Sequence, residues 1–123
     1  MHWFPFLIVL ALFAVMFFTK RRGEISREAA RRLLKNGALI IDVRTSGEFN
    51  SGHLENSINI PLDEIDFAAP KRVKNKNQAL LLHCASGIRS GVARKGLNNL
   101  GYANAFNVGS FSRAKKILGV GTD

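Results

Sequence analysis

Short apolar runs that alternate with helix-favouring stretches are the feature that most constrains how this chain folds. The runs are rich in branched side chains, largely without the polar alternation of a half-exposed strand, and this pattern indicates strands buried on both faces. They lie at residues 38–43, 57–60, 79–83 and 104–108, and the predicted helices at residues 26–37, 62–68, 90–101 and 111–119. The alternation predicts an α/β fold with a central parallel sheet flanked by helices on both faces.

The ends of two predicted helices carry local signals. Ser26 is a suitable N-cap, Glu28 suits the positive N-terminus of the first helix, and Gly37 is a suitable stop. Pro70 is expected to limit the helix over 62–68. In a parallel sheet of this kind, sites form where loops leave the carboxyl ends of the strands.

The N-terminal stretch differs from the rest of the chain. Residues 3–18 carry no charge, and "KRR" follows at 20–22. As a helix the run would be about 24 Å long, slightly short of the roughly 30 Å hydrocarbon core. We expect one transmembrane helix, with residues 1–23 as anchor and basic stop and residues 24–123 as the domain. The basic residues after the run predict a single-pass protein of a bacterial-type inner membrane, with the soluble domain facing the cytoplasm.

Two other interpretations of this stretch fit less well. A cleaved signal peptide would carry positive charge before the apolar run and small residues at a cleavage site after it, and neither is present. A buried core helix of a small domain would have one polar face, whereas this run is apolar all round.

The net charge of +9 is unevenly distributed. Seven basic residues lie within 20–35, against two acidic ones. A solvated face is the simplest interpretation, and contact with anionic lipid is the specific one behind a membrane anchor. Nucleic-acid binding is disfavoured because no aromatic residues interleave with the basic ones. The one cysteine, Cys84, excludes an intrachain disulfide.

Cys84 lies in the stretch "HCASGIRS", directly after a predicted strand and before a predicted helix. A lone cysteine is more often a small buried hydrophobic residue than a nucleophile. At this place, however, backbone N–H groups converge, and the helix end carries about half a positive charge. Gly87 permits the necessary backbone angles, and Arg89 adds a fixed positive charge. These surroundings lower the pKa of a thiol, and the same donors would bind an anion.

Three ordered motifs resemble the rhodanese-like family. They are "ALLLH" followed by "CASGIRS", "LIIDVRTSGEFNSGHLENSINIPL", and "LGYANAFNVGS", and the resemblance runs from about Glu24 to Leu118. It implies a rhodanese-like fold and a sulfurtransferase. Its loop, Cys84 to Arg89, is one residue shorter than the loop of the phosphatases and arsenate reductases that share this fold.

The resemblance also implies a mechanism without metal or organic cofactor. The Cys84 thiolate would take sulfane sulfur from a small anionic donor, thiosulfate or a persulfide, and pass it from a Cys84 persulfide to a nucleophilic acceptor such as a thiol. The substrate-binding loop would be Ala85, Ser86, Gly87, Ile88 and Arg89, with Asp42 and Arg44 in supporting roles. A non-catalytic sulfur carrier or binding module is the alternative, and a phosphatase or arsenate reductase is disfavoured by the loop length.

The remaining candidate residues have structural interpretations. Glu48 is expected to pair with a nearby base or to cap a turn, and His53 to be structural. His83 should point away from Cys84 because side chains alternate along a strand. Arg89 is the only charge in the loop, whereas many thiosulfate-using members carry a second one. The oligomeric state, the physiological donor and the acceptor are left open.

Overall fold

The computed structural model describes residues 2–123, with only the backbone described at 17–22. Its centre is a four-stranded sheet in the order β2-β1-β3-β4, in which every neighbouring pair is parallel. The strands are β1 (Leu39–Asp42), β2 (Ser57–Asn59), β3 (Leu80–Cys84) and β4 (Ala105–Ser110). β3 is buried along its whole length, which explains why its sequence lacks polar alternation. The predicted α/β fold with a parallel sheet is confirmed.

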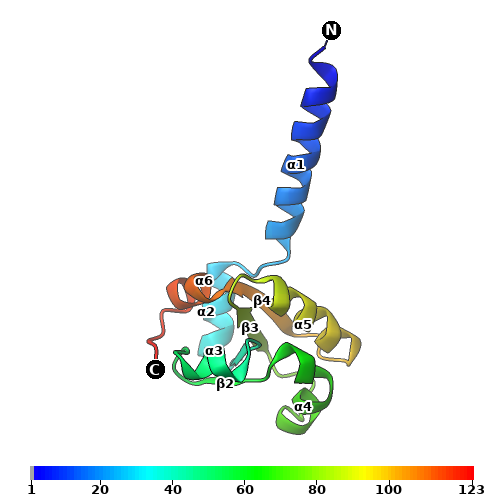
Figure 1. Cartoon of the computed structure of the whole chain (residues 1–123). Helices are drawn as coiled ribbons and strands as arrows, with labels where there is room; N and C mark the ends of the chain where they lie inside the picture. Colours follow the sequence, from blue (N-terminus) through cyan, green and yellow to red (C-terminus); the bar gives the residue numbers. More distant parts are fainter. Residues whose placement is uncertain (1) are drawn as a thin grey trace.

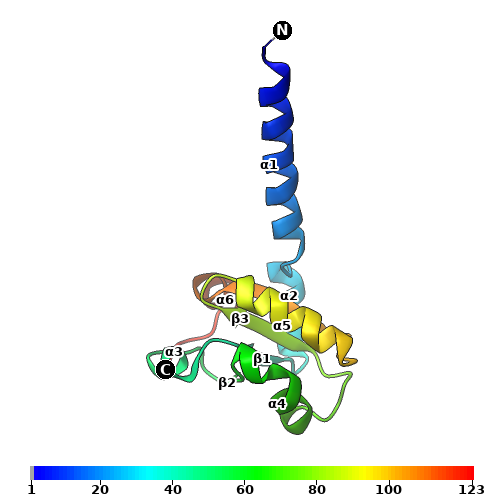
Figure 2. The same ribbon diagram turned by 45° about the vertical axis from the view of Figure 1, so that its right-hand side comes forward.

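Helices cover both faces of this sheet (Figure 1). One face packs against α4 (Ile65–Arg72) and α5 (Ile88–Asn99), through a buried cluster that includes Val43, Cys84 and Tyr102. The other packs against α2 (Arg27–Lys35) and α6 (Phe111–Leu118), which contact each other. Figure 2 shows α5 running along β3, and the loop between these two elements begins at Cys84.

Local signals explain one predicted helix end and not another. The Ser26 side chain accepts a hydrogen bond of 3.2 Å from the Ala29 N–H, so the predicted N-cap of α2 is confirmed. Pro70 does not stop α4: the short 3-10 helix η1 (Leu62–Glu64) leads into it, and α4 continues to Arg72. A proline removes one backbone hydrogen bond, and this one lies in the last turns of the helix.

One short helix was not predicted. α3 (Ser46–Asn50) follows β1 and begins with a capping box, in which Thr45 and Glu48 satisfy each other's backbone N–H groups. Its five residues are too few for hydrophobic periodicity to appear, so only the cap residues could have revealed it.

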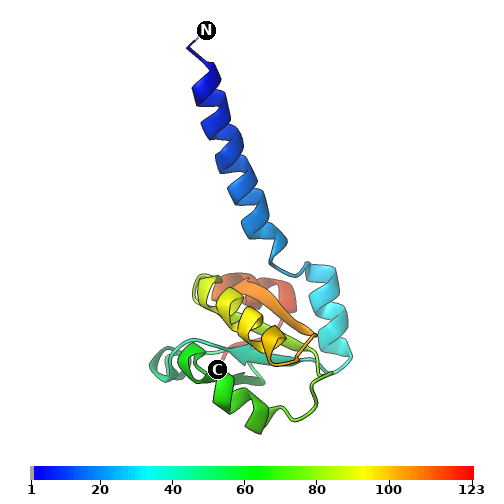
Figure 3. The same cartoon turned by 90° about the vertical axis from the view of Figure 1, so that its right-hand side faces the viewer.

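The N-terminal stretch forms the helix α1 (Phe4–Arg22), which projects from the domain (Figure 3). The expected transmembrane helix is not supported, because no helix among the described residues is both long enough and apolar enough to cross a membrane. The side chains at 20–22, expected to form the basic stop, lie outside the described residues. Their backbone continues the helix.

Candidate active site

Cys84 lies at the carboxyl end of β3, where the chain turns into α5. The helix starts at Ile88, two residues before the predicted start, so the last two residues of the predicted loop, Ile88 and Arg89, lie in its first turn. Gly87 is the N-cap and has a φ of 96°, in the left-handed region that favours glycine. The thiol is fully buried at the bottom of this turn, and the side chains of Ala85 and Ile88 are exposed above it.

Hydrogen bonds converge on the Cys84 sulfur. The Gly87 N–H donates to Sγ over 2.9 Å, and the Ser90 hydroxyl oxygen lies within weaker reach of Sγ, at 3.5 Å. Burial raises the pKa of the Cys84 thiol, but bonds from the Ser90 side chain and from backbone N–H groups outweigh it, so the pKa is lowered. The same hydrogen bonds favour the thiolate, the reactive form of cysteine, relative to the thiol. Ser90 was not among the predicted site residues.

Asn107 on β4 forms hydrogen bonds with the turn that follows Cys84. Its Nδ2 donates to the Gly87 carbonyl over 3.1 Å, and its Oδ1 accepts from the Ser90 hydroxyl over 2.7 Å and from the Gly109 N–H over 2.9 Å. Both side-chain polar atoms of this buried amide are thus used. Asn107 fixes two of the groups that surround Cys84. The sequence offered no signal for it, because it lies 17 residues from Ser90.

The Arg89 side chain forms an ion pair with Glu48 of α3. Its two terminal nitrogens donate to the two carboxylate oxygens over 2.6 and 2.9 Å, a bidentate pair. The Arg89 hydrogen bond, with help from Thr45, lowers the pKa of Glu48 from 4.5 to about 2. The hydrogen bond to Glu48 in turn raises the pKa of Arg89. Both expectations for Glu48, pairing with a base and capping a turn, are confirmed.

Asp42 and Arg44 form a buried pair at the end of β1. Arg44 donates to both oxygens of Asp42, with the shortest contact at 2.7 Å, and also to the Gly52 carbonyl over 2.7 Å. Its guanidinium lies 4.5 Å from the centre of the Phe111 ring. These contacts tie β1 to the segment after α3, the helix that carries Glu48. The geometry fits a positioning role.

His83 lies on the opposite face of the sheet from Cys84. Its ring is fully buried, stands 3.8 Å from Asp42 Oδ2, and contacts Phe111 of α6. Among the described residues neither ring nitrogen has a hydrogen-bond partner. Burial lowers the pKa of His83, although Asp42 opposes the shift. His53, in contrast, bonds the Phe49 carbonyl over 2.9 Å and stacks on the Phe49 ring.

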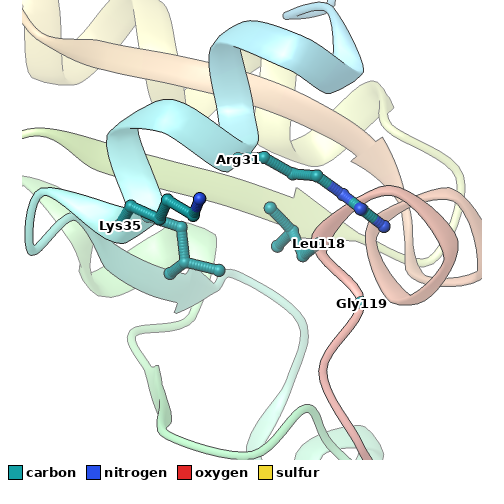
Figure 4. Close-up of a pocket in the computed structure, with 5 residues that line it drawn as sticks. Arg31, Lys35, Leu118 and Gly119 are labelled. Carbon is teal, nitrogen blue, oxygen red and sulfur yellow. The ribbon is translucent and has the colours of Figure 1, made fainter.

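A cleft opens beside the loop, with a volume of about 450 Å³. Its lining combines the end of β1, the start of η1 and the beginning of α5: Val43, Thr45, Pro61, Leu62, Asp63 and Arg89. A second, smaller pocket of about 320 Å³ lies between α2 and α6, lined by Arg31, Leu34, Lys35, Leu118 and Gly119 (Figure 4). In the described part of the chain no cluster of three metal-ligating side chains occurs.

The comparisons with known proteins agree on one family. The model of the rhodanese-like domain matches residues 26–116. The chain is 35% identical over 69 residues to the thiosulfate sulfurtransferase PspE of Escherichia coli K12, covering 56% of this chain and 66% of PspE. It is 29% identical over 94 residues to the tRNA uridine(34) hydroxylase of Photorhabdus laumondii, covering 72% of this chain but 27% of that protein.

Solved structures share the fold. The structure of a rhodanese with anions from E. coli superposes with a TM-score of 0.63 at 29% identity, covering 71% of this chain and 98% of that one. A human single-domain sulfurtransferase has a TM-score of 0.64 at 24% identity, covering 76% and 96%. The second likeness concerns the fold alone.

Proposed function

This chain belongs to the rhodanese-like family, and from that premise we propose that it is a sulfurtransferase that works through a persulfide on Cys84. The observation that carries the proposal is the buried sulfur at the end of β3, surrounded by N–H and O–H donors that lower the pKa of its thiol. The similarity to a thiosulfate sulfurtransferase supports the same reaction class.

The proposed reaction has two displacement steps. The Cys84 thiolate attacks the sulfane sulfur of the donor; a new S–S bond forms, the bond to the leaving group breaks, and the electron pair departs with the leaving group. With thiosulfate the leaving group is sulfite. The thiolate of an acceptor thiol then attacks the outer sulfur. A new S–S bond forms on the acceptor, which becomes a persulfide, the S–S bond to Cys84 breaks, and its electron pair returns to the Cys84 sulfur as the thiolate. The persulfide keeps a negative charge throughout, and the N–H groups of the first turn of α5 would stabilise it.

The supporting residues would hold other groups of the site in place and would not contact the substrate. Ser90 and Asn107 hold the donors around the sulfur, and Glu48 holds Arg89. Asp42 and Arg44 would order the end of β1 and the segment that leads to Glu48. No metal or organic cofactor is required by this chemistry.

A non-catalytic sulfur carrier or binding module is the second candidate. The bidentate pairing of Arg89 favours it, since a neutralised arginine attracts an anionic donor less strongly. The tRNA uridine(34) hydroxylases, of which this chain spans only a small share, also contain a region similar to it. A carrier would load sulfur on Cys84 but turn over slowly.

The deciding experiment is mass spectrometry of the full chain after exposure to thiosulfate or to an organic persulfide. The proposal expects a gain of one sulfur atom that maps to Cys84, is removed by a thiol or by cyanide, and does not occur in Cys84→Ala. Steady-state transfer of sulfur to cyanide separates an enzyme from a carrier. If Cys84→Ala retains transfer, or if the wild type takes up no sulfur from any donor, the proposal is wrong.

We also propose that the chain contacts a membrane through residues 3–18 and 20–35, with the domain of residues 24–123 in the cytoplasm. Support comes from the apolar side chains of α1, of which Phe4, Phe13 and others are more than half exposed. Arg31 and Lys35 add basic groups beside Leu34 and Leu118 in the pocket of Figure 4, a combination suited to anionic lipid.

Cell fractionation tests this location. The full chain should sediment with membranes and resist extraction by high salt, whereas Arg31→Gln with Lys35→Gln should weaken binding to vesicles that contain anionic lipid. A tag at the C-terminus should be cut only by a protease on the cytoplasmic side. Recovery of the full chain in the soluble fraction would contradict the proposal.

A further inference from the structure

The charge beside Cys84 is smaller than the loop sequence implies. The positive charge of Arg89 is paired with the carboxylate of Glu48. The loop residues from 85 to 88 carry no charge, and the adjacent cleft contributes an acidic side chain, Asp63. A donor with two negative charges, such as thiosulfate, therefore meets little compensating charge at the mouth of the site.

The cleft beside the loop offers apolar contact instead. Three of its six lining residues, Val43, Pro61 and Leu62, present apolar side chains. Val43 and Leu62 belong to the same packed cluster as Cys84, and Arg89 is shared by the cleft and the loop. The volume of about 450 Å³ lies within the range of small-molecule sites. It exceeds what a thiosulfate ion would fill.

We propose that this cleft binds the organic part of the sulfur donor, so that the site prefers a singly charged donor with an apolar substituent, of the class R–SO₂–S⁻ or R–S–S⁻, over thiosulfate. The inference rests on the proposed function and specifies its substrate class. The sulfane sulfur is placed against the Cys84 sulfur, and the substituent R lies against Val43, Pro61 and Leu62.

The chemical step balances without another reactant. With a thiosulfonate, the Cys84 thiolate attacks the terminal sulfur, an S–S bond forms, and the sulfur–sulfonyl bond breaks. The electron pair leaves on the sulfinate, R–SO₂⁻, and the outer sulfur of the Cys84 persulfide keeps the negative charge. The leaving group carries R, so its contact with the cleft is retained through the transition state and raises kcat/KM.

Three donors separate the effect of charge from the effect of the substituent: thiosulfate, methanethiosulfonate and benzenethiosulfonate. The first two differ mainly in charge, and the last two mainly in apolar area. We expect kcat/KM of the full chain to rise at least about tenfold from methanethiosulfonate to benzenethiosulfonate. Thiosulfate should be the poorest of the three donors.

Two variants locate these preferences. Leu62→Ser should reduce the ratio of kcat/KM for the benzene donor to that for the methane donor. The ratio is independent of how much protein is folded. Val92→Ser is the matched control, because Val92 is a half-exposed apolar residue of α5 outside the cleft lining. Asp63→Asn should raise kcat/KM for thiosulfate about two- to fivefold relative to methanethiosulfonate.

The outcomes distinguish this inference from the proposed function. Equal kcat/KM for the two thiosulfonates, or an unchanged ratio in Leu62→Ser, would overturn the inference while sulfur transfer through Cys84 still stood. A preference for thiosulfate over both thiosulfonates would also overturn it. Failure of these three donors, and of an organic persulfide, to load sulfur on Cys84 would remove the proposed function, and the inference with it.

Discussion

Glu48 and Arg89, 41 residues apart, are joined by two hydrogen bonds of 2.6 and 2.9 Å, one to each carboxylate oxygen. This pair joins the short helix α3 to the first turn of α5, next to Cys84. Arg89 is therefore both the only charged side chain of the loop and a residue whose charge is already compensated. Its first effect is to hold the turn in place, and its attraction for anions is reduced.

Glu48→Gln should lower stability slightly, in a pH-dependent way. The Arg89 hydrogen bond lowers the pKa of Glu48 from 4.5 to about 2, so the stabilisation is present above about pH 4.5 and is lost as pH falls toward 2. Since both side chains are about a third exposed, the effect should stay below about 1 kcal/mol.

Urea unfolding at several pH values between 3 and 7 checks this. The difference between wild type and Glu48→Gln should be largest at neutral pH and shrink on acidification. Glu55→Gln, at an exposed position outside the helices, is the control. A difference that does not depend on pH would contradict the assigned role of the ion pair.

Ser90→Ala should make Cys84 less reactive. The Ser90 hydroxyl is among the donors that lower the pKa of the Cys84 thiol. Without it, the effect of burial is opposed by fewer hydrogen bonds, so the pKa of the thiol rises. Alkylation by iodoacetamide near neutral pH should slow by about tenfold, and the midpoint of the rate against pH should move upward. Ser112→Ala, at an exposed serine of α6, should leave the profile unchanged. The same profile in both variants would exclude Ser90 from the site.

Gly109→Ala should destabilise the protein by about 1–3 kcal/mol. Gly109 has a φ of 106°, which disfavours any other residue, and an added Cβ would lie 2.9 Å from a carboxylate oxygen of Glu24. Thermal unfolding measures the loss. Gly47→Ala is the matched control, because its φ is ordinary and the nearest atom would be 4.0 Å away. If the double variant with Glu24→Ala recovered fully, contact and not backbone strain would be the cause.

His83→Leu should flatten the dependence of stability on mildly acidic pH. Burial lowers the pKa of His83 below 6.5 in the folded state. The unfolded chain then binds the proton first, so stability is present above about pH 6.5 and falls as pH drops toward the lowered folded value, by at most about 1.4 kcal/mol per pH unit.

Denaturant unfolding between pH 5 and 8 measures how the free energy of unfolding changes with pH. His2→Gln, at an exposed site, serves as the control and should keep the wild-type slope. The leucine also removes two ring nitrogens that lack partners in the described structure, so His83→Leu should not be less stable than wild type below pH 6. A slope retained in the variant would assign the titration to another group.

The strands, the cap of α2 and the place of Cys84 could be predicted because each depends on neighbouring residues. Four apolar runs with intervening helical stretches specify a parallel α/β sheet, and Ser26 caps the helix that directly follows it. The expectation for residues 3–18 shows the limit of composition. An apolar run predicts a helix, and α1 forms, but the membrane crossing is not supported by the described residues.

What only the tertiary structure decided lies between elements that are distant along the chain. Asn107 reaches the turn at Gly87 from β4, Glu48 reaches Arg89 from α3, and the cleft combines residues from β1 to α5. No local pattern encodes these contacts, because they depend on which strands are neighbours and on where each strand ends. The sequence by itself determined that a cysteine would sit at the carboxyl end of a buried strand, where the chain turns into a helix. Packing of the sheet and its helices decided which side chains hold the turn, and how much of its charge is left for a substrate.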